Sequence, residues 1–357
     1  MNLTEQTILS QLAQIIHPEF EKNIVELGMI TNVNIENDEI TFTFLPKRQH
    51  DPFATSIKKK CEQILIENFP SAKIKIDDAH KQQSQQVKQN PELLKKNYAL
   101  KNVKHIVAIA SGKGGVGKST VAVNLAVSLA NKGFKIGLVD ADIYGPSIPK
   151  MFGIENAQPM MVQVEDFELI EPVERYGVKI MSIGFFITAD DALIWRAPMA
   201  TNALRQIAGE THWGELDFLF IDLPPGTGDI HLTMVQEIKL DGAIIVTTPQ
   251  PVALADAVKG INMFRQEKIS VPIFGLVENM AWFTPEELPE NRYYIFGKDG
   301  GKKLADKMQI TLLAQIPIVQ SVRQNSDDGT PTALENNIQS KIFAELADNF
   351  INEIKKH

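Results

Sequence analysis

The sequence has a single cysteine, Cys61, among its 357 residues. One chain therefore forms no intrachain disulfide and offers no site built only from its own cysteines. The apolar runs are shorter than the about 20 residues of a membrane-spanning helix, and the first residues lack the basic and apolar regions of a signal peptide. We therefore expect a cytoplasmic protein without stable membrane association.

Positive charge is also in short supply, because 36 lysines and arginines face 44 aspartates and glutamates, which gives a formal net charge of −8. A surface that binds nucleic acid needs a basic excess, so we expect no nucleic-acid partner. Apolar residues, by contrast, make up 44% of the chain. That is enough to build the cores of about two domains at this length.

Residues 1–80 predict a small α+β domain. After a first helical pattern, alternating apolar residues over 31–44 indicate a β-hairpin. A helix over 51–69 and a short strand over 74–76 follow, which gives the order α-β-β-α-β. The polar, Gln-rich residues 81–102 are typical of a flexible linker, within which some helix can form.

Residues 103–357 predict a larger α/β domain. Short apolar runs, suited to strands buried on both faces, alternate there with helical patterns. These runs are 105–110, 136–140, 218–222, 243–248 and 273–279. Alternating strands and helices of this kind predict a doubly wound, mainly parallel sheet.

A phosphate-binding motif lies between the first of these strands and the helix after it. Residues 112–119 satisfy G-x-x-x-x-G-K-[ST], whose backbone N–H groups and following helix N-terminus bind nucleotide phosphates. We expect Lys118 to reach the β and γ phosphates and Ser119 to bind Mg²⁺. The predicted ATP-binding residues of this loop are Gly112, Lys113, Gly114, Gly115, Val116, Gly117, Lys118, Ser119 and Thr120.

The same loop also fits the fingerprint of a dinucleotide site. Gly112, Gly114 and Gly117 match G-x-G-x-x-G, and Asp140 ends the next predicted strand, as that fingerprint requires. A dinucleotide site has no use for a Lys-Ser pair, so residues 118–119 decide in favour of ATP.

A second acidic residue supports ATP binding. Asp222 ends the apolar run FLFI, at the position where a P-loop ATPase uses a carboxylate to hold Mg²⁺. The residues after it, PPGTG over 224–228, are typical of a loop that senses the γ-phosphate.

Several longer motifs resemble one family. Lys113 marks the deviant Walker A group of ATPases, which includes MinD, ParA, the arsenite-pump ATPases and the nitrogenase iron protein. Within that group, residues 139–153 (VDADIYGPSIPKMFG) and 220–229 (FIDLPPGTGD) look like the Mrp/ApbC iron–sulfur cluster carrier ATPases. ENM at 278–280 and IFGKDGGKKLA at 295–305 add to this resemblance. The N-terminal domain is similar to the small Fe–S assembly domain often fused ahead of these ATPases.

The resemblance implies a homodimeric ATPase, slow and dimer-dependent, that binds and transfers iron–sulfur clusters. The implied site residues are the catalytic Lys113, Lys118 and Asp142, the Mg²⁺ ligands Ser119, Asp140 and Asp222, and the adenine contacts Asn279 and Pro317. Lys113 would cross the dimer interface to the partner's phosphates, and Asp142 would orient the attacking water. The division of labour between Asp140 and Asp142 stays open, because either could instead cap the turn after the strand. The implied cofactors are ATP, Mg²⁺ and a 4Fe–4S cluster, and the implied partners are client apoproteins or Fe–S assembly proteins.

The chain departs from this family at the residues that would hold the cluster. The family carries a C-x-x-C pair shortly after ENM, so that two subunits supply four thiolates, but residues 281–294 contain no cysteine. Residues 45–53, where the fused domain usually has a reactive cysteine, contain none either. Cys61 lies further on, in a predicted helix, and we interpret it as a partly buried or incidental helix cysteine. The Fe–S ligands are therefore unknown.

Three functions stay open. The first is a cluster carrier whose cluster is held unusually or with a client's help. The second is a nucleotide-switched dimer that gates partner binding without a cluster of its own. The third is a MinD- or ParA-like positioning ATPase, whose membrane contact would use the amphipathic stretch 338–354, although such a pattern more often packs against a core. His50 and Asp51 are candidate ligands, but a surface turn is the favoured interpretation.

Overall fold

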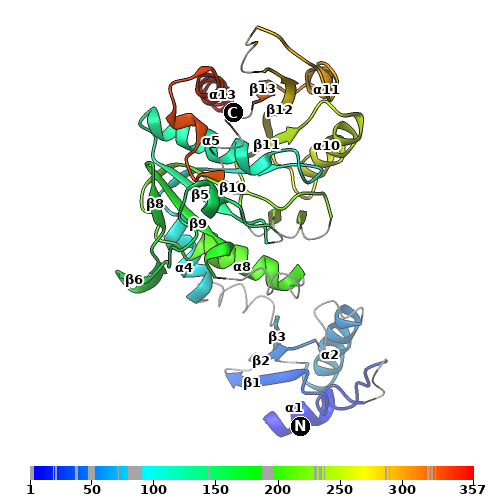
Figure 1. The fold of residues 1–357 in the computed structure, drawn as a ribbon. Coiled ribbons are helices and arrows are strands. Elements are labelled where there is room, and N and C mark those ends of the chain that lie inside the picture. The colour runs from blue at the N-terminus through cyan, green and yellow to red at the C-terminus, as the bar shows by residue number, and fades with distance from the viewer. Residues whose placement is uncertain are drawn as a thin grey trace. The chain divides into compact units, whose positions relative to one another are not determined.

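The computed structural model describes residues 4–18, 20, 22–36, 39–46, 53–70, 72–78, 91–143, 145–186, 197–228, 231–232, 235–236, 238–285, 288, 290–319, 322, 325 and 327–357. The chain divides into two compact units, Met1–Leu94 and Lys95–His357 (Figure 1). Each unit is described by itself. His50 and Asp51 lie outside the described residues.

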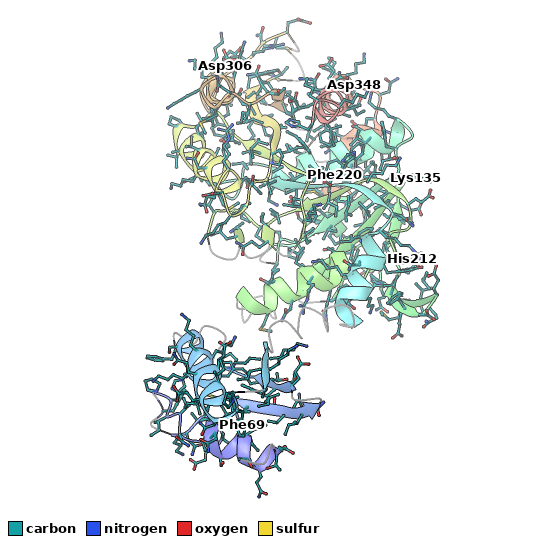
Figure 2. All side chains as sticks on the ribbon, turned by 180° about the vertical axis from the view of Figure 1, so that it is seen from behind. Phe69, Lys135, His212, Phe220, Asp306 and Asp348 are labelled. Carbon is teal, nitrogen blue, oxygen red and sulfur yellow. The ribbon has the colours of Figure 1, made fainter. Side chains whose placement is uncertain are left out.

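The N-terminal unit has the predicted α-β-β-α-β order. Its elements are α1 (Glu5–Leu12), β1 (Ile30–Glu36), β2 (Glu39–Phe44), α2 (Ala54–Asn68) and β3 (Lys73–Asp78). Strand β2 lies at the centre of the sheet, antiparallel to β1 and parallel to β3. The buried side chains of the unit, among them Phe42, Phe69 and Cys61, form one apolar core (Figure 2 labels Phe69).

The second half of the predicted linker is a helix. Helix α4 (Pro91–Leu100) reaches the larger unit through its last residues, where Lys95 Nζ lies 2.7 Å from Glu210 Oε2. The ring of Tyr98 also packs 4.7 Å from that of Phe167. The polar composition of this segment concealed these two contacts, and α4 is the helix that the sequence allowed within the predicted linker.

The larger unit is built on an eight-stranded sheet in the order β13-β12-β11-β4-β10-β5-β9-β8. Neighbouring strands are parallel except at the β8–β9 edge. The strands are β4 (Val103–Ala110), β5 (Ile136–Asp140), β8 (Val173–Arg175), β9 (Val178–Ser182), β10 (Leu216–Asp222), β11 (Gly242–Thr247), β12 (Ile273–Phe283) and β13 (Leu312–Ile318). A separate antiparallel ribbon pairs β6 (Met161–Val164) with β7 (Phe167–Ile170).

Helices cover both faces of this sheet, which confirms the doubly wound α/β prediction. Helices α5 (Lys118–Asn131) and α13 (Ile338–Ile354) lie side by side over one face (Figure 1). Helices α8 (Ala197–Gly209), α10 (Pro251–Phe264) and α11 (Gly300–Met308) cover the other. Short helical turns form α6 (Ile148–Met151), η2 (Ile183–Phe185) and η3 (Thr332–Leu334).

The apolar stripe of α13 is buried against the sheet. Phe343, Leu346 and Phe350 are each 1% exposed or less, and the rings of Phe350 and Phe220 lie 5.5 Å apart. Burial of each such side chain is worth about 1.5–3 kcal/mol, which explains why this stripe packs inward. Among the described residues, the structure has no helix whose length and apolar content would let it cross a membrane.

Candidate nucleotide-binding site

The phosphate-binding loop joins β4 to α5 at the C-terminal edge of the parallel strands. Gly115 and Gly117 adopt left-handed φ angles of 79° and 82°, a region that favours glycine. A Cβ on Gly117 would lie 2.2 Å from Asn279 Nδ2, and one on Gly112 would lie 2.1 Å from the Asp256 carbonyl oxygen. The loop therefore needs glycine for its turn and for its close approach to both neighbours.

Lys118, Ser119 and Asp222 meet at the start of α5. Lys118 Nζ donates to Asp222 Oδ1 at 2.7 Å, and Ser119 Oγ donates to Asp222 Oδ2 at 2.5 Å. The Lys118 side chain is 6% exposed and that of Asp222 is fully buried. Strand pairing brings these residues together, because Asp222 of β10 stands in register with Ile109 of β4.

The donor set suits a nucleotide–magnesium complex. A lysine ammonium aimed at the loop complements phosphate charge, while a carboxylate and a hydroxyl are hard oxygen ligands of the kind that Mg²⁺ takes. In the structure described here, the lysine and the hydroxyl both bind Asp222. Lys118 would therefore bind phosphate, and Ser119 and Asp222 would bind Mg²⁺, from a cluster that is already assembled.

The two acids after β5 occupy different environments. Asp140 is fully buried and accepts hydrogen bonds from Ile148 N at 3.1 Å, Ser182 Oγ at 3.0 Å and Asp142 N at 3.3 Å. Burial raises the pKa of Asp140 to about 7, with a further contribution from repulsion by Asp222. Asp140 thus organises the loop that follows β5.

Asp142 instead borders the phosphate cavity. Its Oδ2 lies 3.8 Å from Lys118 Nζ, and its side chain is 15% exposed. The cavity has a volume of about 200 Å³. It is lined by Ser111, Gly114, Gly115, Val116, Gly117, Lys118, Ser119, Thr120, Asp142, Ser147, Met151 and Pro225. Asp142 therefore lines the phosphate cavity, whereas Asp140 is not among its lining residues. The separate roles of the two acids stay a prediction.

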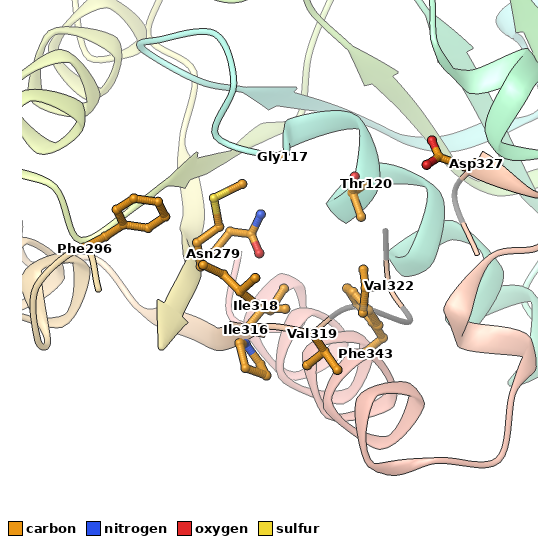
Figure 3. A pocket seen from close by; sticks show the side chains of 12 residues that line it. Gly117, Thr120, Asn279, Phe296, Ile316, Ile318, Val319, Val322, Asp327 and Phe343 are labelled. Atoms are coloured by element: carbon orange, nitrogen blue, oxygen red, sulfur yellow. The ribbon is translucent and has the colours of Figure 1, made fainter. Parts of the chain in front are cut away.

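A second cavity, of about 370 Å³, adjoins the first and shares Gly117 and Thr120 with it. Figure 3 shows its walls, which are mostly apolar. They are formed by Gly117, Thr120, Asn279, Met280, Phe296, Ile316, Pro317, Ile318, Val319, Val322, Asp327 and Phe343. Both predicted adenine contacts, Asn279 and Pro317, are among them. An apolar slot beside a phosphate cavity has the shape and chemistry to hold a nucleotide base.

Two predicted loop residues do not line either cavity. Gly112 packs under α10, and Lys113 is exposed, with its carbonyl accepting from Ser111 Oγ at 3.0 Å. Contact between Lys113 and a partner's nucleotide stays a prediction.

Sequence reasoning missed His231 behind the segment 224–228. Its Nε2–H donates to the Pro224 carbonyl at 2.9 Å, and the side chain is 8% exposed. Burial lowers the pKa of His231, although backbone hydrogen bonds oppose this. The residue is hydrogen-bonded to the loop whose Pro225 lines the phosphate cavity. The scattered histidines of the sequence carried no spacing signal that could have singled it out.

Two family models match this chain. A family model described as NUBPL iron-transfer P-loop NTPase matches residues 102–351, and one described as iron-sulfur cluster assembly protein matches residues 5–76. The chain belongs to the NUBPL iron-transfer P-loop NTPase family. Hydrolysis of a nucleoside triphosphate is the reaction class of this NTPase family.

Relatives in this iron-transfer NTPase family span nearly the whole chain. An iron-sulfur cluster carrier protein of Synechocystis is 41% identical over 92% of this chain and 91% of its own length. That of Escherichia coli K12 is 41% identical over 96% of this chain and 90% of its own length.

Solved structures agree on the fold. A nucleotide-binding protein of Archaeoglobus fulgidus in complex with ADP is 40% identical, covers 68% of this chain and 93% of its own, and has a TM-score of 0.59. The MinD protein of Pyrococcus horikoshii, complexed with Mg-ADP, has a TM-score of 0.53 at 23% identity over 70% of this chain and 97% of its own. At that identity the MinD likeness shows the fold alone.

The lone thiol of this iron-transfer NTPase is poorly placed to ligate iron. Cys61 is fully buried in the core of the N-terminal unit, and burial raises the pKa of its thiol to about 12. Within the described ranges, no three His, Cys, Asp or Glu side chains gather as a metal site would require. The interpretation of Cys61 as a buried helix cysteine agrees with this placement.

Proposed function

We propose that the chain is a slow, dimer-dependent ATPase that binds iron–sulfur clusters and transfers them to client apoproteins. The observation that supports it most is the Lys118–Asp222–Ser119 cluster beside a base-sized apolar cavity. Membership of the iron-transfer NTPase family and the names of the carrier relatives support an iron–sulfur cluster as the cargo. A cytoplasmic location and the absence of a nucleic-acid partner stay predictions from composition.

Hydrolysis would need no covalent intermediate, because water attacks the γ-phosphorus directly and ADP leaves with inorganic phosphate. Lys118 and the N–H groups of residues 114–119 would bind the phosphate oxygens. Asp142, at the cavity wall, would orient the attacking water. Ser119, Asp222 and Asp140 would hold Mg²⁺, and the ion would neutralise phosphate charge when bound.

The cargo, a 4Fe–4S cluster in our proposal, would draw its ligands from outside this chain's thiols. A homodimer contributes two copies of Cys61, and each lies in an apolar core with its pKa near 12. A cluster normally takes four thiolates. We therefore place the missing ligands on the client or on an assembly partner.

Burial of Cys61 also favours a second candidate, a nucleotide-switched dimer that gates partner binding without a cluster of its own. The third candidate, a membrane-positioning ATPase, loses its sequence argument, because the apolar side chains Phe343, Leu346 and Phe350 of α13 lie in the core.

Anaerobic reconstitution with iron and sulfide distinguishes the first two candidates. The carrier proposal expects bound iron and visible charge-transfer absorption only when a thiol-rich client is present, equally in wild type and in Cys61→Ser. If no iron is bound even with the client present, the nucleotide-switched dimer is the candidate that remains. Iron bound without a client and lost in Cys61→Ser would contradict our placement of the ligands.

Lys118→Ala tests the ATPase itself. Loss of ATP turnover is expected, whereas Lys302→Ala, an exposed lysine of α11, should retain it. Lys113→Ala should still bind ATP. In light scattering, however, ATP should no longer raise its molar mass from that of a monomer toward that of a dimer. Turnover by Lys118→Ala equal to wild type would refute the phosphate assignment.

A further inference from the structure

The stretch from Met280 in β12 to Phe296 begins and ends in the wall of the apolar cavity proposed for the base. Met280 and Phe296 both line that cavity (Figure 3 labels Phe296), and the residues described between them are not among its lining residues. Between them Phe283 and Tyr293 exchange two backbone hydrogen bonds of 2.8 and 2.9 Å as an antiparallel pair. We call residues 281–285 and 290–295 the hairpin stems. Both stems therefore adjoin residues that line the cavity proposed for the base.

The backbone at the first root is strained. Met280 has a φ of 55°, a left-handed conformation that disfavours residues with a Cβ. The β12–β13 pairing also shifts register there, since Asn279 stands opposite Ile316 but Phe283 stands opposite Ile318. Three residues on β12 therefore face Pro317 alone, which is a β-bulge. Bulges and strained residues of this kind occur where a strand must redirect its side chains beside a site.

The same strand is tied to the phosphate loop. Asn279 Nδ2 donates to the Val116 carbonyl at 2.8 Å, and the Asn279 amide lies so close to Gly117 that a Cβ there would collide with it. Immediately beyond Asn279 comes the bulge. A nucleotide that enters the cavity thus meets a strand already fixed on its P-loop side, with Met280 as the first residue free to respond.

On the other side of the wall lies a third cavity, of about 470 Å³. Trp282, Thr284 and Arg292 of the hairpin stems line it, and Pro317 and Val319 line both this cavity and the base cavity. The Arg292 guanidinium stacks 4.2 Å from the centre of the Trp282 ring. One layer of side chains therefore separates a bound base from the packing of the stems.

We propose that Met280 and Phe296 contact the base of a bound adenine nucleotide and that the base thereby sets the conformation of the hairpin stems. The nucleotide state is then presented at the surface by Tyr293 and Ile295, which are 47% and 62% exposed. This inference rests on the proposed function only in taking an adenine nucleotide as the ligand.

Hydrogen–deuterium exchange on the full-length protein tests this, with ADP compared against pyrophosphate. Both ligands should protect peptides covering residues 112–120, because both offer phosphates to the loop. ADP alone should slow exchange in the stem peptides, by about threefold or more, since pyrophosphate leaves the base cavity empty. Equal slowing of the stems by both ligands, or none with ADP, would overturn the proposal.

Variants at the two roots sharpen the test. Phe296→Ala and Met280→Gly should keep ADP protection of residues 112–120 at saturating ADP but lose most of the protection of the stems. Phe186→Ala and Met160→Ala, at exposed positions away from both cavities, are matched controls and should respond like wild type. A full wild-type response of the stems in both root variants would contradict the assignment.

The result is separable from the proposed function. Absence of ATP turnover or of cluster transfer would refute the proposed function, even if ADP still slowed exchange in the stem peptides. If ADP leaves exchange in the stem peptides unchanged in a protein that hydrolyses ATP and transfers clusters, only this inference is refuted.

Discussion

Replacing Asp222 with Asn should destabilise the larger unit in a way that a nucleotide repairs. The substitution keeps the shape of the side chain but leaves Lys118, 6% exposed, without its 2.7 Å carboxylate partner. Breaking a buried ion pair costs about 3–5 kcal/mol. Asp142 Oδ2, 3.8 Å from Lys118 Nζ, compensates in part. We therefore expect the free energy of unfolding to fall by about 3 kcal/mol. For a unit of this size that lowers the thermal midpoint by roughly 6 °C.

Differential scanning fluorimetry in EDTA measures both halves of this prediction. ADP without Mg²⁺ should raise the midpoint of Asp222→Asn by more than that of wild type. In the variant Lys118 gains the phosphate as a partner, whereas in wild type it must first give up Asp222. Glu215→Ala, which breaks the exposed Lys135–Glu215 pair, is the control and should leave the midpoint unchanged within about 1 °C. A variant midpoint equal to wild type, or equal ADP shifts, would refute the reasoning.

Three further changes follow from the same geometry. Gly117→Ala should weaken ADP binding at least about tenfold in calorimetry, because its Cβ would strike Asn279 at a left-handed φ of 82°. His231→Leu should lower kcat about tenfold with little change in KM, since the buried Pro224 carbonyl loses its donor. Cys61 should resist alkylation at pH 9 in the folded protein, and alkaline unfolding, followed by circular dichroism, should be steeper in wild type than in Cys61→Ala.

The sign of the Cys61 effect follows from its pKa, which rises from 9.0 to about 12 on folding. Below pH 9 the thiol is neutral in both states and costs nothing. Between about pH 9 and 12 only the unfolded chain releases the proton, so the stability that this thiol preserves at neutral pH is lost as pH rises. Equal slopes for wild type and Cys61→Ala would contradict the burial of the thiol.

Conservative variants serve as controls for the other two changes. Gly260→Ala adds a Cβ that meets only an ordinary 3.8 Å contact with Thr227 Cγ2, so nucleotide affinity should be retained. His231→Gln keeps an amide donor and should restore much of kcat. Loss of kcat in His231→Gln as complete as in His231→Leu would remove the positioning role.

The phosphate loop could be predicted because its information is local. Glycine at 117, Lys118 and Ser119 stand in one short segment, and the strand before it and helix after it follow from hydrophobic period alone. The predicted strand over 273–279 is confirmed as the first part of β12. The strand continues to Phe283, which pairs with Ile318 of β13 and with Tyr293, and nothing in the local sequence indicates either partner.

Contacts between distant residues escaped prediction for the same reason. The packing of α4 through Lys95 depends on Glu210, which lies 115 residues further along the chain. The β6–β7 ribbon and the edge strand β8 are local hairpins, because Val164 pairs with Phe167 and Arg175 with Val178, and these short strands were not predicted. The left-handed Met280 could not be foreseen either, because methionine has no preference for that conformation. Its strain is imposed by the register of β12 against β13.

ATP-dependent delivery of a 4Fe–4S cluster to an apoprotein is the measurement that tests the central claim most directly. A cluster assembled on a thiol-rich donor is offered with a client apoprotein, and client activation is followed with and without ATP. The account predicts ATP-dependent activation by wild type and by Cys61→Ala, and none by Lys118→Ala. Activation that ignores ATP and persists in Lys118→Ala, or that vanishes in Cys61→Ala, would contradict it.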